Sequence, residues 1–435
     1  MTFSTVIFQL VERLLLARLS VHAMETVTIT AYICQIFQIS CVAIAMMAQI
    51  DVGRWHGAGE WKRIGPGVWQ MIWFSFLSML ATVPLSLIYG RHYLRGSGVE
   101  SIALPYLYFI VAINFLYPLG AALTGFYLGR RETRFVLCMT IAFQGMKILL
   151  GYLLIVGWKD WIPSFGLLGG VMSTLIAQGG FCIVLLVVFL KEKHAKIYHS
   201  RHWHFNRKLF WHGIYPGTLR AINRILNGTS WASIAGLMTA RGETHLLILT
   251  IGGTVFLLFS FIGDALLQAQ TTSISNSIGA QNESMMHRAF RSGSQLALVG
   301  IALAGIPLLF LPIQTYDYLF PTIALEEGLV RNVFFGLWLC LGFHIFSSVL
   351  TAYILAFKDT KFSCFMGGVN WINGFLLMFV FLEKVGISAD QFWTALSLMH
   401  GSTLIIYYFR MKWLQAAAYS SAITIPSIKL GTSSN

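Results

Sequence analysis

The stretch Phe181-Cys-Ile-Val-Leu-Leu-Val-Val-Phe-Leu190 contains apolar residues without interruption. A membrane barrel would alternate apolar and polar residues along each strand, which this run does not do. Lipid offers the backbone no hydrogen-bond partners, so a run of this kind crosses a bilayer as a helix. Similar runs fill most of the 435 residues, of which 56% are hydrophobic and 11% charged, whereas soluble domains carry about 25% charged residues. The sequence therefore predicts an all-α polytopic membrane protein.

Twelve apolar segments bounded by charged or turn residues approach the ~20 residues that a spanning helix needs. They cover residues 2–18, 25–50, 66–90, 103–128, 134–158, 165–190, 209–238, 245–277, 287–312, 329–356, 362–384 and 391–413. The first segment is short, as if the sequence began inside that helix through a late start or a truncation. No cleavable leader is expected, because no small-residue cleavage signal follows the first segment.

Basic residues gather in every second loop, at 54–63, 130–134, 191–208, 288–291 and 358–361, and again at 410–412. The opposite loops hold few basic residues and an acidic stretch at 317–327. Cytoplasmic loops of membrane proteins are enriched in Lys and Arg, so we expect both termini in the cytoplasm. The same loops explain the net charge of +13 without a nucleic-acid partner.

The two halves of the chain resemble each other at two places. Gly125-Phe-Tyr-Leu-Gly-Arg-Arg-Glu-Thr-Arg134 parallels Ala352-Tyr-Ile-Leu-Ala-Phe-Lys-Asp-Thr-Lys361, and Gly57-Ala-Gly-Glu60 parallels Gly279-Ala-Gln-Asn282. A repeat of six spans keeps its orientation, which predicts two pseudo-symmetric six-helix bundles with a cavity between them. We expect bundles at 1–190 and 209–413, a basic cytoplasmic linker at 191–208 and a tail at 414–435.

Signals for catalysis, cofactors and metals are weak. The six cysteines show no CxxC spacing, so they are expected to be core residues. The linker histidines (His194, His199, His202 and His204) could bind a metal, but a solvated loop near anionic headgroups explains them more simply. No P-loop, His-Glu-x-x-His or Gly-x-Ser-x-Gly pattern occurs. We expect no enzyme activity, cofactor or metal, while a membrane-embedded enzyme and a noncatalytic scaffold or inactive relative stay as alternatives.

The chain resembles the multidrug and toxic compound extrusion (MATE) transporters over nearly its whole length. The matching pieces are Ala17–Ala23 after an acidic residue, Gly57–Gly59, Pro118 with Gly125–Arg134, Tyr152–Gly157, Pro163–Gly170, Gly213–Pro216 and Ile278–Asn282. The resemblance implies two six-helix bundles that export cationic or amphipathic compounds in exchange for Na⁺ or H⁺. It also implies the bacterial inner membrane, and the fold can work as a monomer.

Ionisable groups at membrane depth are functional candidates, because burying them in lipid is costly. Glu12 falls where the family carries an acidic residue implicated in coupling. The fifth helix of the family often has an Asn and, four residues on, an Asp; here these positions hold Lys147 and Gly151. We expect Lys147 to pair with Glu12, its ammonium taking the place of Na⁺. A purely structural pair, or Glu12 with Arg13, is the alternative.

The second half departs further from the family. Some bacterial relatives carry a Glu eight residues past Pro216, where this chain has Arg224, with Arg220 one turn earlier. Asp264 is the expected partner of these arginines, and His344 is the titratable group of the tenth span. The second-half cation site is therefore expected to be absent. His344 could carry protons or pack as a neutral ring.

Pro118 and Pro216 lie inside spans, where proline kinks a helix. The sequence as a whole predicts a secondary transporter that exports small organic molecules by alternating access, coupled to H⁺ rather than Na⁺. A flippase of lipid-linked sugars is the rival function, because Lys147, Arg220 and Arg224 suit a pyrophosphate better than a cation.

Overall fold

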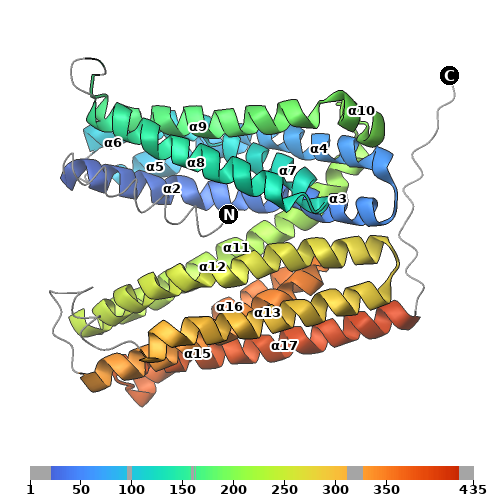
Figure 1. The fold of residues 1–435 in the computed structure, drawn as a ribbon. Coiled ribbons are helices and arrows are strands. Elements are labelled where there is room, and N and C mark those ends of the chain that lie inside the picture. The colour runs from blue at the N-terminus through green and yellow to red at the C-terminus, as the bar shows by residue number, and fades with distance from the viewer. Residues whose placement is uncertain (1–20, 96–99, 158–160, 162, 311–326, 421–435) are drawn as a thin grey trace.

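The computed structural model describes residues 21–95, 100–157, 161, 163–310 and 327–420. Within these ranges the secondary structure is helical, as the sequence predicts. Figure 1 shows two groups of long helices, blue to green and yellow to red, which meet near α3 and α12 and splay apart away from that meeting point. The chain is thus an all-helical protein of two bundles.

The N-terminal bundle contains the first nine described helices. They are α2 (Val21–Ala45), α3 (Met47–Gly57), η1 (Trp61–Arg63), α4 (Ile64–Leu77), α5 (Met79–Leu94), α6 (Glu100–Ile113), α7 (Leu116–Gly129), α8 (Thr133–Val156) and α9 (Gly166–Phe189). Its core lies around α7, where Phe126 and Tyr127 are almost fully buried. Phe126 packs edge-on against Phe189 of α9, so aromatic contacts hold these helices together.

The C-terminal bundle is built from longer, less interrupted helices. They are α11 (Arg207–Ala240), α12 (Glu243–Gly279), α13 (Glu283–Phe310), α15 (Glu327–Ala356), α16 (Thr360–Phe379), η2 (Val380–Val385), η3 (Ala389–Gln391) and α17 (Phe392–Ser420). The largest fully buried side chain of the described residues is Trp393. Its ring stacks on Phe256 of α12, which fills the centre of this bundle.

Helices occupy every expected span from 25–50 onward. Eight helical segments of the described residues are long and apolar enough to cross a bilayer, and both bundles contain such segments. The segment 2–18, and Glu12 with it, lies outside the described residues. The lengths and apolar composition of these helices therefore agree with the predicted membrane-spanning fold.

The internal repeat is visible in the backbone of four matching turns. Gly59 and Gln281 both have a positive φ, of 72° and 52°, and so do Arg131 and Lys358, at 65° and 57°. Non-glycine residues rarely adopt this left-handed conformation, so its recurrence at paired positions indicates one local design used twice. These turns lie at one end of the bundles, which we call the basic end. The domain limits stay a prediction.

The linker folds over the basic end of the N-terminal bundle. It contains α10 (Glu192–Tyr198), and the side chains of Trp69 and Gln70 on α4 donate hydrogen bonds to backbone carbonyls of this segment. The Arg130 guanidinium stacks over the rings of Phe126 and Tyr198. The linker is therefore packed on the first bundle through cation–π and hydrogen-bond contacts.

Three helix breaks divide spans in the N-terminal bundle, one of them at Ser78 between α4 and α5. A turn at Met46 separates α2 from α3, and Asn114 with Phe115 separates α6 from α7. Pro118 lies in the first turn of α7, after that break, whereas Pro216 lies inside the continuous α11. A functional role for either proline in bending during transport remains a prediction.

Candidate functional site

A cavity of about 320 Å³ is lined mainly by α2, α3, α7, α8 and α9 of the N-terminal bundle, together with Gln268 of α12. Its described lining is rich in glutamine. Five glutamines contribute to it: Gln38, Gln49, Gln144, Gln178 and Gln268. Amides carry both donors and acceptors, so the cavity can hydrogen-bond a polar ligand at several points. Its volume lies at the lower limit of typical small-molecule sites.

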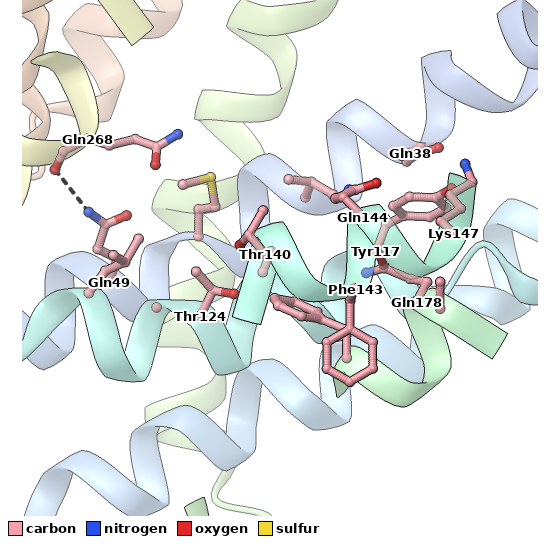
Figure 2. Close-up of a pocket in the computed structure, with 18 of the residues that line it drawn as sticks. Gln38, Gln49, Tyr117, Thr124, Thr140, Phe143, Gln144, Lys147, Gln178 and Gln268 are labelled. Atoms are coloured by element: carbon pink, nitrogen blue, oxygen red, sulfur yellow. Dashed lines mark hydrogen bonds between the residues drawn. The ribbon is translucent and has the colours of Figure 1, made fainter. Parts of the chain in front are cut away.

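The polar groups form two clusters at opposite ends of the cavity (Figure 2). Gln38, Tyr117, Gln144 and Lys147 lie at one end, and Gln49 and Gln268 lie at the other. Thr124 and Thr140 lie between these ends (Figure 2), and apolar and aromatic side chains, including Phe143 and Phe181, also line the cavity. A ligand with a polar group at each end would match this arrangement.

Lys147 brings a positive charge to the cavity. Its side chain is half-buried on α8 and appears beside Gln38 and Tyr117 (Figure 2). The described lining contains no carboxylate, while the expected partner Glu12 lies outside the described residues. The pairing of Lys147 with Glu12 therefore stays a prediction, and the cavity charge that the described lining supplies is positive.

The inner wall of the cavity joins the two bundles. Gln49 on α3 is buried, and its Nε2 donates hydrogen bonds to the Gln268 carbonyl at 3.0 Å and to Thr272 Oγ1 at 2.7 Å. Both partners belong to α12 of the C-terminal bundle. A side chain that contacts the cavity thus also holds the bundles together.

Beginning two residues further along α3, charged groups cross between the bundles. Asp51 forms an ion pair with Lys358, which follows α15, and lies 3.7 Å from His212 Nε2 on α11. Lys358 Nζ is 2.9 Å from the same ring nitrogen. Burial lowers the pKa of Lys358, and the Asp51 carboxylate opposes this by raising it. We call Asp51, Arg54, His212 and Lys358 the inter-bundle cluster.

Arg54 and two glycines complete the contact at the basic end. The Arg54 guanidinium donates to the Ala356 carbonyl through Nε at 3.0 Å and Nη2 at 2.6 Å. A Cβ on Gly57 would overlap the Asn276 carbonyl, and a Cβ on Gly279 would overlap that of Arg54. The helix backbones therefore touch at these glycines, which explains why both copies of the repeat begin with Gly.

The charged residues predicted in the second half lie away from this cavity. Arg220 is buried on α11 and Arg224 is exposed on the same helix. Asp264 and Arg224 are within electrostatic range of the His344 ring, but no ion pair joins Arg224 to Asp264 in the described part of the chain. The structure thus gathers Arg224, Asp264 and His344 in one region, separate from Lys147.

The same region of the C-terminal bundle is filled by rings. The His344 and His400 ring centroids are 6.0 Å apart, and Phe256 lies 5.3 Å from His344. The His400 Nε2 atom is buried without a hydrogen-bond partner among the described residues. Aromatic packing of this kind favours His344 as a packed ring, and its use in proton transfer stays a prediction.

The sequence-based search for charged residues inside spans did not predict the cavity glutamines or the inter-bundle cluster. The prediction weighed only ionisable groups inside spans, whereas amides carry no charge and Asp51 falls one residue beyond the segment 25–50. Intramembrane glutamines in successive spans were the available signal, because buried polar groups in lipid need partners. Lys147 is the predicted residue that the structure places in the cavity.

Comparison with known proteins agrees with this architecture. The family model MatE matches residues 1–153. Two curated relatives are each described as probable multidrug resistance protein NorM. That of Thermotoga maritima is 24% identical over 43% of this chain and 41% of its own length, and that of Synechocystis is 25% identical over 60% and 57%. The matched part thus spans about two fifths to three fifths of these relatives.

Solved structures match nearly the whole chain. One, titled as the outward-facing conformation of a multidrug resistance MATE family transporter of the MOP superfamily, has a TM-score of 0.84 at 14% identity and covers 96% of this chain and 93% of its own. Another, a MOP superfamily transporter from Pyrococcus furiosus titled for the reverse polarity of its binding pocket, has a TM-score of 0.82 at 14% identity with the same coverage. The first 153 residues thus match the MatE family model, and nearly the whole chain shares the fold of solved MATE transporters.

Proposed function

We propose that this protein is a secondary active transporter that exports small organic molecules across a bacterial inner membrane by alternating access. The observation that carries the proposal is the cavity whose inner wall, at Gln49, is bonded to the opposite bundle. A ligand site placed against a separable contact between two bundles is what alternating access requires. The basic end, closed here, faces the cytoplasm in this proposal, with both termini on the same side.

Coupling to H⁺ rather than Na⁺ is part of the proposal. Lys147 carries the positive charge of the cavity, and an ammonium tethered there would repel a second cation. The Glu12 carboxylate would bind the proton. It would bind the proton alternately with the substrate, or alternately with the Lys147 ammonium. Transport should therefore be driven by a pH gradient and should not respond to a Na⁺ gradient.

Proteoliposomes containing the protein test this coupling with ethidium as the organic cation. A pH gradient should drive ethidium movement in the native protein, and Glu12→Gln should abolish that response. Lys147→Asn should gain a response to Na⁺, because it removes the competing ammonium. Glu192→Gln and Lys196→Asn are matched controls, since these residues form an exposed pair in the linker. Sodium-stimulated transport by the native protein would refute the proposal.

An anionic substrate, such as a lipid-linked sugar pyrophosphate, is a second candidate. The described cavity lining supplies one ammonium, several amide donors and no carboxylate, a set that suits phosphate oxygens. Arg220 and Arg224 do not line this cavity, so Lys147 would carry the recognition. The Pyrococcus furiosus neighbour, which has a similar fold, is described as having a binding pocket of reverse polarity, and this supports the second candidate.

Binding measurements separate the two substrate classes. Farnesyl pyrophosphate and ethidium would be titrated against the purified protein, with tryptophan fluorescence as the readout and farnesol as the uncharged comparison. An anion site predicts binding of the pyrophosphate that weakens about tenfold or more in Lys147→Gln, in proportion to a lost charge-assisted bond. Tighter binding of ethidium than of the pyrophosphate would leave the cationic class as the substrate.

A further inference from the structure

Helix α3 connects the cavity to every inter-bundle contact described above. Its first turns contribute Gln49 to the cavity wall, and its next turns contribute Asp51 and Arg54 to the inter-bundle cluster. Gly57 ends the helix against the backbone of α12. Since a turn at Met46 interrupts the helix before α3, these eleven residues can move as a short rod relative to α2.

The hydrogen-bond capacity of Gln49 is fully used on its donor side. A primary amide has two N–H donors, and here one goes to the Gln268 carbonyl and the other to Thr272 Oγ1. The carbonyl partner can only accept, which fixes the orientation of the amide. A ligand group that accepts a hydrogen bond from Gln49 must therefore displace one of the two bonds to α12.

We propose that Gln49 is the residue through which cavity occupancy loosens the contact between the bundles. The inference rests on the proposed transport function and assigns its switch to one amide. A ligand with a hydrogen-bond acceptor at this end of the cavity exchanges a bond within the protein for a bond to the ligand. The attachment of α3 to α12 is weakened as a result, next to the inter-bundle cluster.

The chemistry of the ligand decides whether this exchange occurs. Hydroxyl, carbonyl and phosphate groups accept hydrogen bonds and compete for the donors of Gln49. A ligand such as tetraphenylphosphonium has no acceptor and leaves both bonds in place. Acceptor-bearing ligands are thus expected to promote opening of the basic end, and ligands without acceptors are expected to bind without doing so.

The test measures the distance between the bundles at the basic end by pulsed electron spin resonance. Spin labels would replace Lys62 and Lys361, which are exposed on different bundles, in a background without the native cysteines. Gln49→Leu keeps the size of the side chain but removes its donors. Its distance distribution should shift toward longer distances without ligand, and farnesyl pyrophosphate should add no further shift.

Two companion variants make the result specific. Thr272→Val removes one of the two bonds at nearly constant volume and should give a smaller shift of the same sign. Gln178→Leu also changes a cavity glutamine, but Gln178 bonds within its own bundle, to the Leu116 carbonyl, so its distances should match the native protein. In the native protein, farnesyl pyrophosphate should lengthen the distance and tetraphenylphosphonium should not.

Native-like distances in Gln49→Leu would overturn the proposal, as would equal shifts in Gln178→Leu. Transport of ethidium and of the pyrophosphate in proteoliposomes is measured in parallel. A distance shift in Gln49→Leu with no transport by the native protein would sink the proposed function while leaving the Gln49 coupling intact. Normal transport by the native protein together with native-like distances in Gln49→Leu would support the proposed function and contradict the Gln49 coupling.

Discussion

The two bundles share one design but differ at their centres. The N-terminal bundle contains a glutamine-lined cavity with Lys147, whereas Trp393, Phe256 and Trp231 pack together inside the C-terminal bundle, whose own hollow of about 260 Å³ is lined by apolar residues and glycine. Gly252 on α12 leaves space for the Trp393 ring, which a Cβ there would overlap. In the proposed function, the duplicated halves therefore need not duplicate the site: the N-terminal half would bind the ligand and the C-terminal half would supply a more tightly packed body.

Truncating one large ring in each bundle tests this difference most strongly. Trp393→Ala should destabilise the protein by about 3–5 kcal/mol, because it removes a fully buried side chain from a filled core. Phe143→Ala should cost less than half as much, since its ring already borders the cavity. Thermal unfolding in detergent measures both values. Equal losses would contradict a filled C-terminal centre and an open N-terminal one.

Breaking the inter-bundle cluster should have the next largest effect. Asp51→Asn leaves the Lys358 ammonium in a buried position, which costs about 3 kcal/mol of closed-state stability. Adding Lys358→Met should recover most of this loss, because the unpaired charge is gone. The exposed pair of Glu192 and Lys196 serves as the control, where Glu192→Gln should change stability by about 0.5 kcal/mol or less.

Thermal unfolding and the distance between labels at positions 62 and 361 would both report this change. A double variant that is no more stable than Asp51→Asn alone would show that Lys358 is not held by the carboxylate. A large effect of Glu192→Gln would show that general charge, rather than the contact between bundles, controls stability.

Filling the N-terminal cavity should have the smallest effect on stability and a clear effect on binding. Ala121→Leu adds volume to the cavity wall without crowding a packed core, so the unfolding free energy should change by less than about 1 kcal/mol. Binding of ethidium or farnesyl pyrophosphate should weaken about tenfold. Ala142→Leu makes the same change at an exposed position of α8 and should bind as the native protein does. Unchanged binding in Ala121→Leu would place the ligand elsewhere.

The sequence predicted the helical spans and the repeat because both depend on local patterns. Apolar runs such as 181–190 define spans, and the matched turns at Gly57 and Gly279 recur in the chain. The break at Met46 was not predictable, since the surrounding residues favour helix on both sides. The pairing of Asp51 with Lys358 depends on tertiary packing between residues far apart in the sequence, and no local pattern reports it.

The most direct test of alternating access is to lock the basic end. An ideal Cβ on Gly53 lies 3.0 Å from the Ser275 Cβ, close to the roughly 3.5–4.5 Å that a disulfide spans. Gly53→Cys with Ser275→Cys, in a background without native cysteines, should transport substrate in proteoliposomes when reduced and stop when oxidised. Transport that continues unchanged in the oxidised, cross-linked protein would contradict the account.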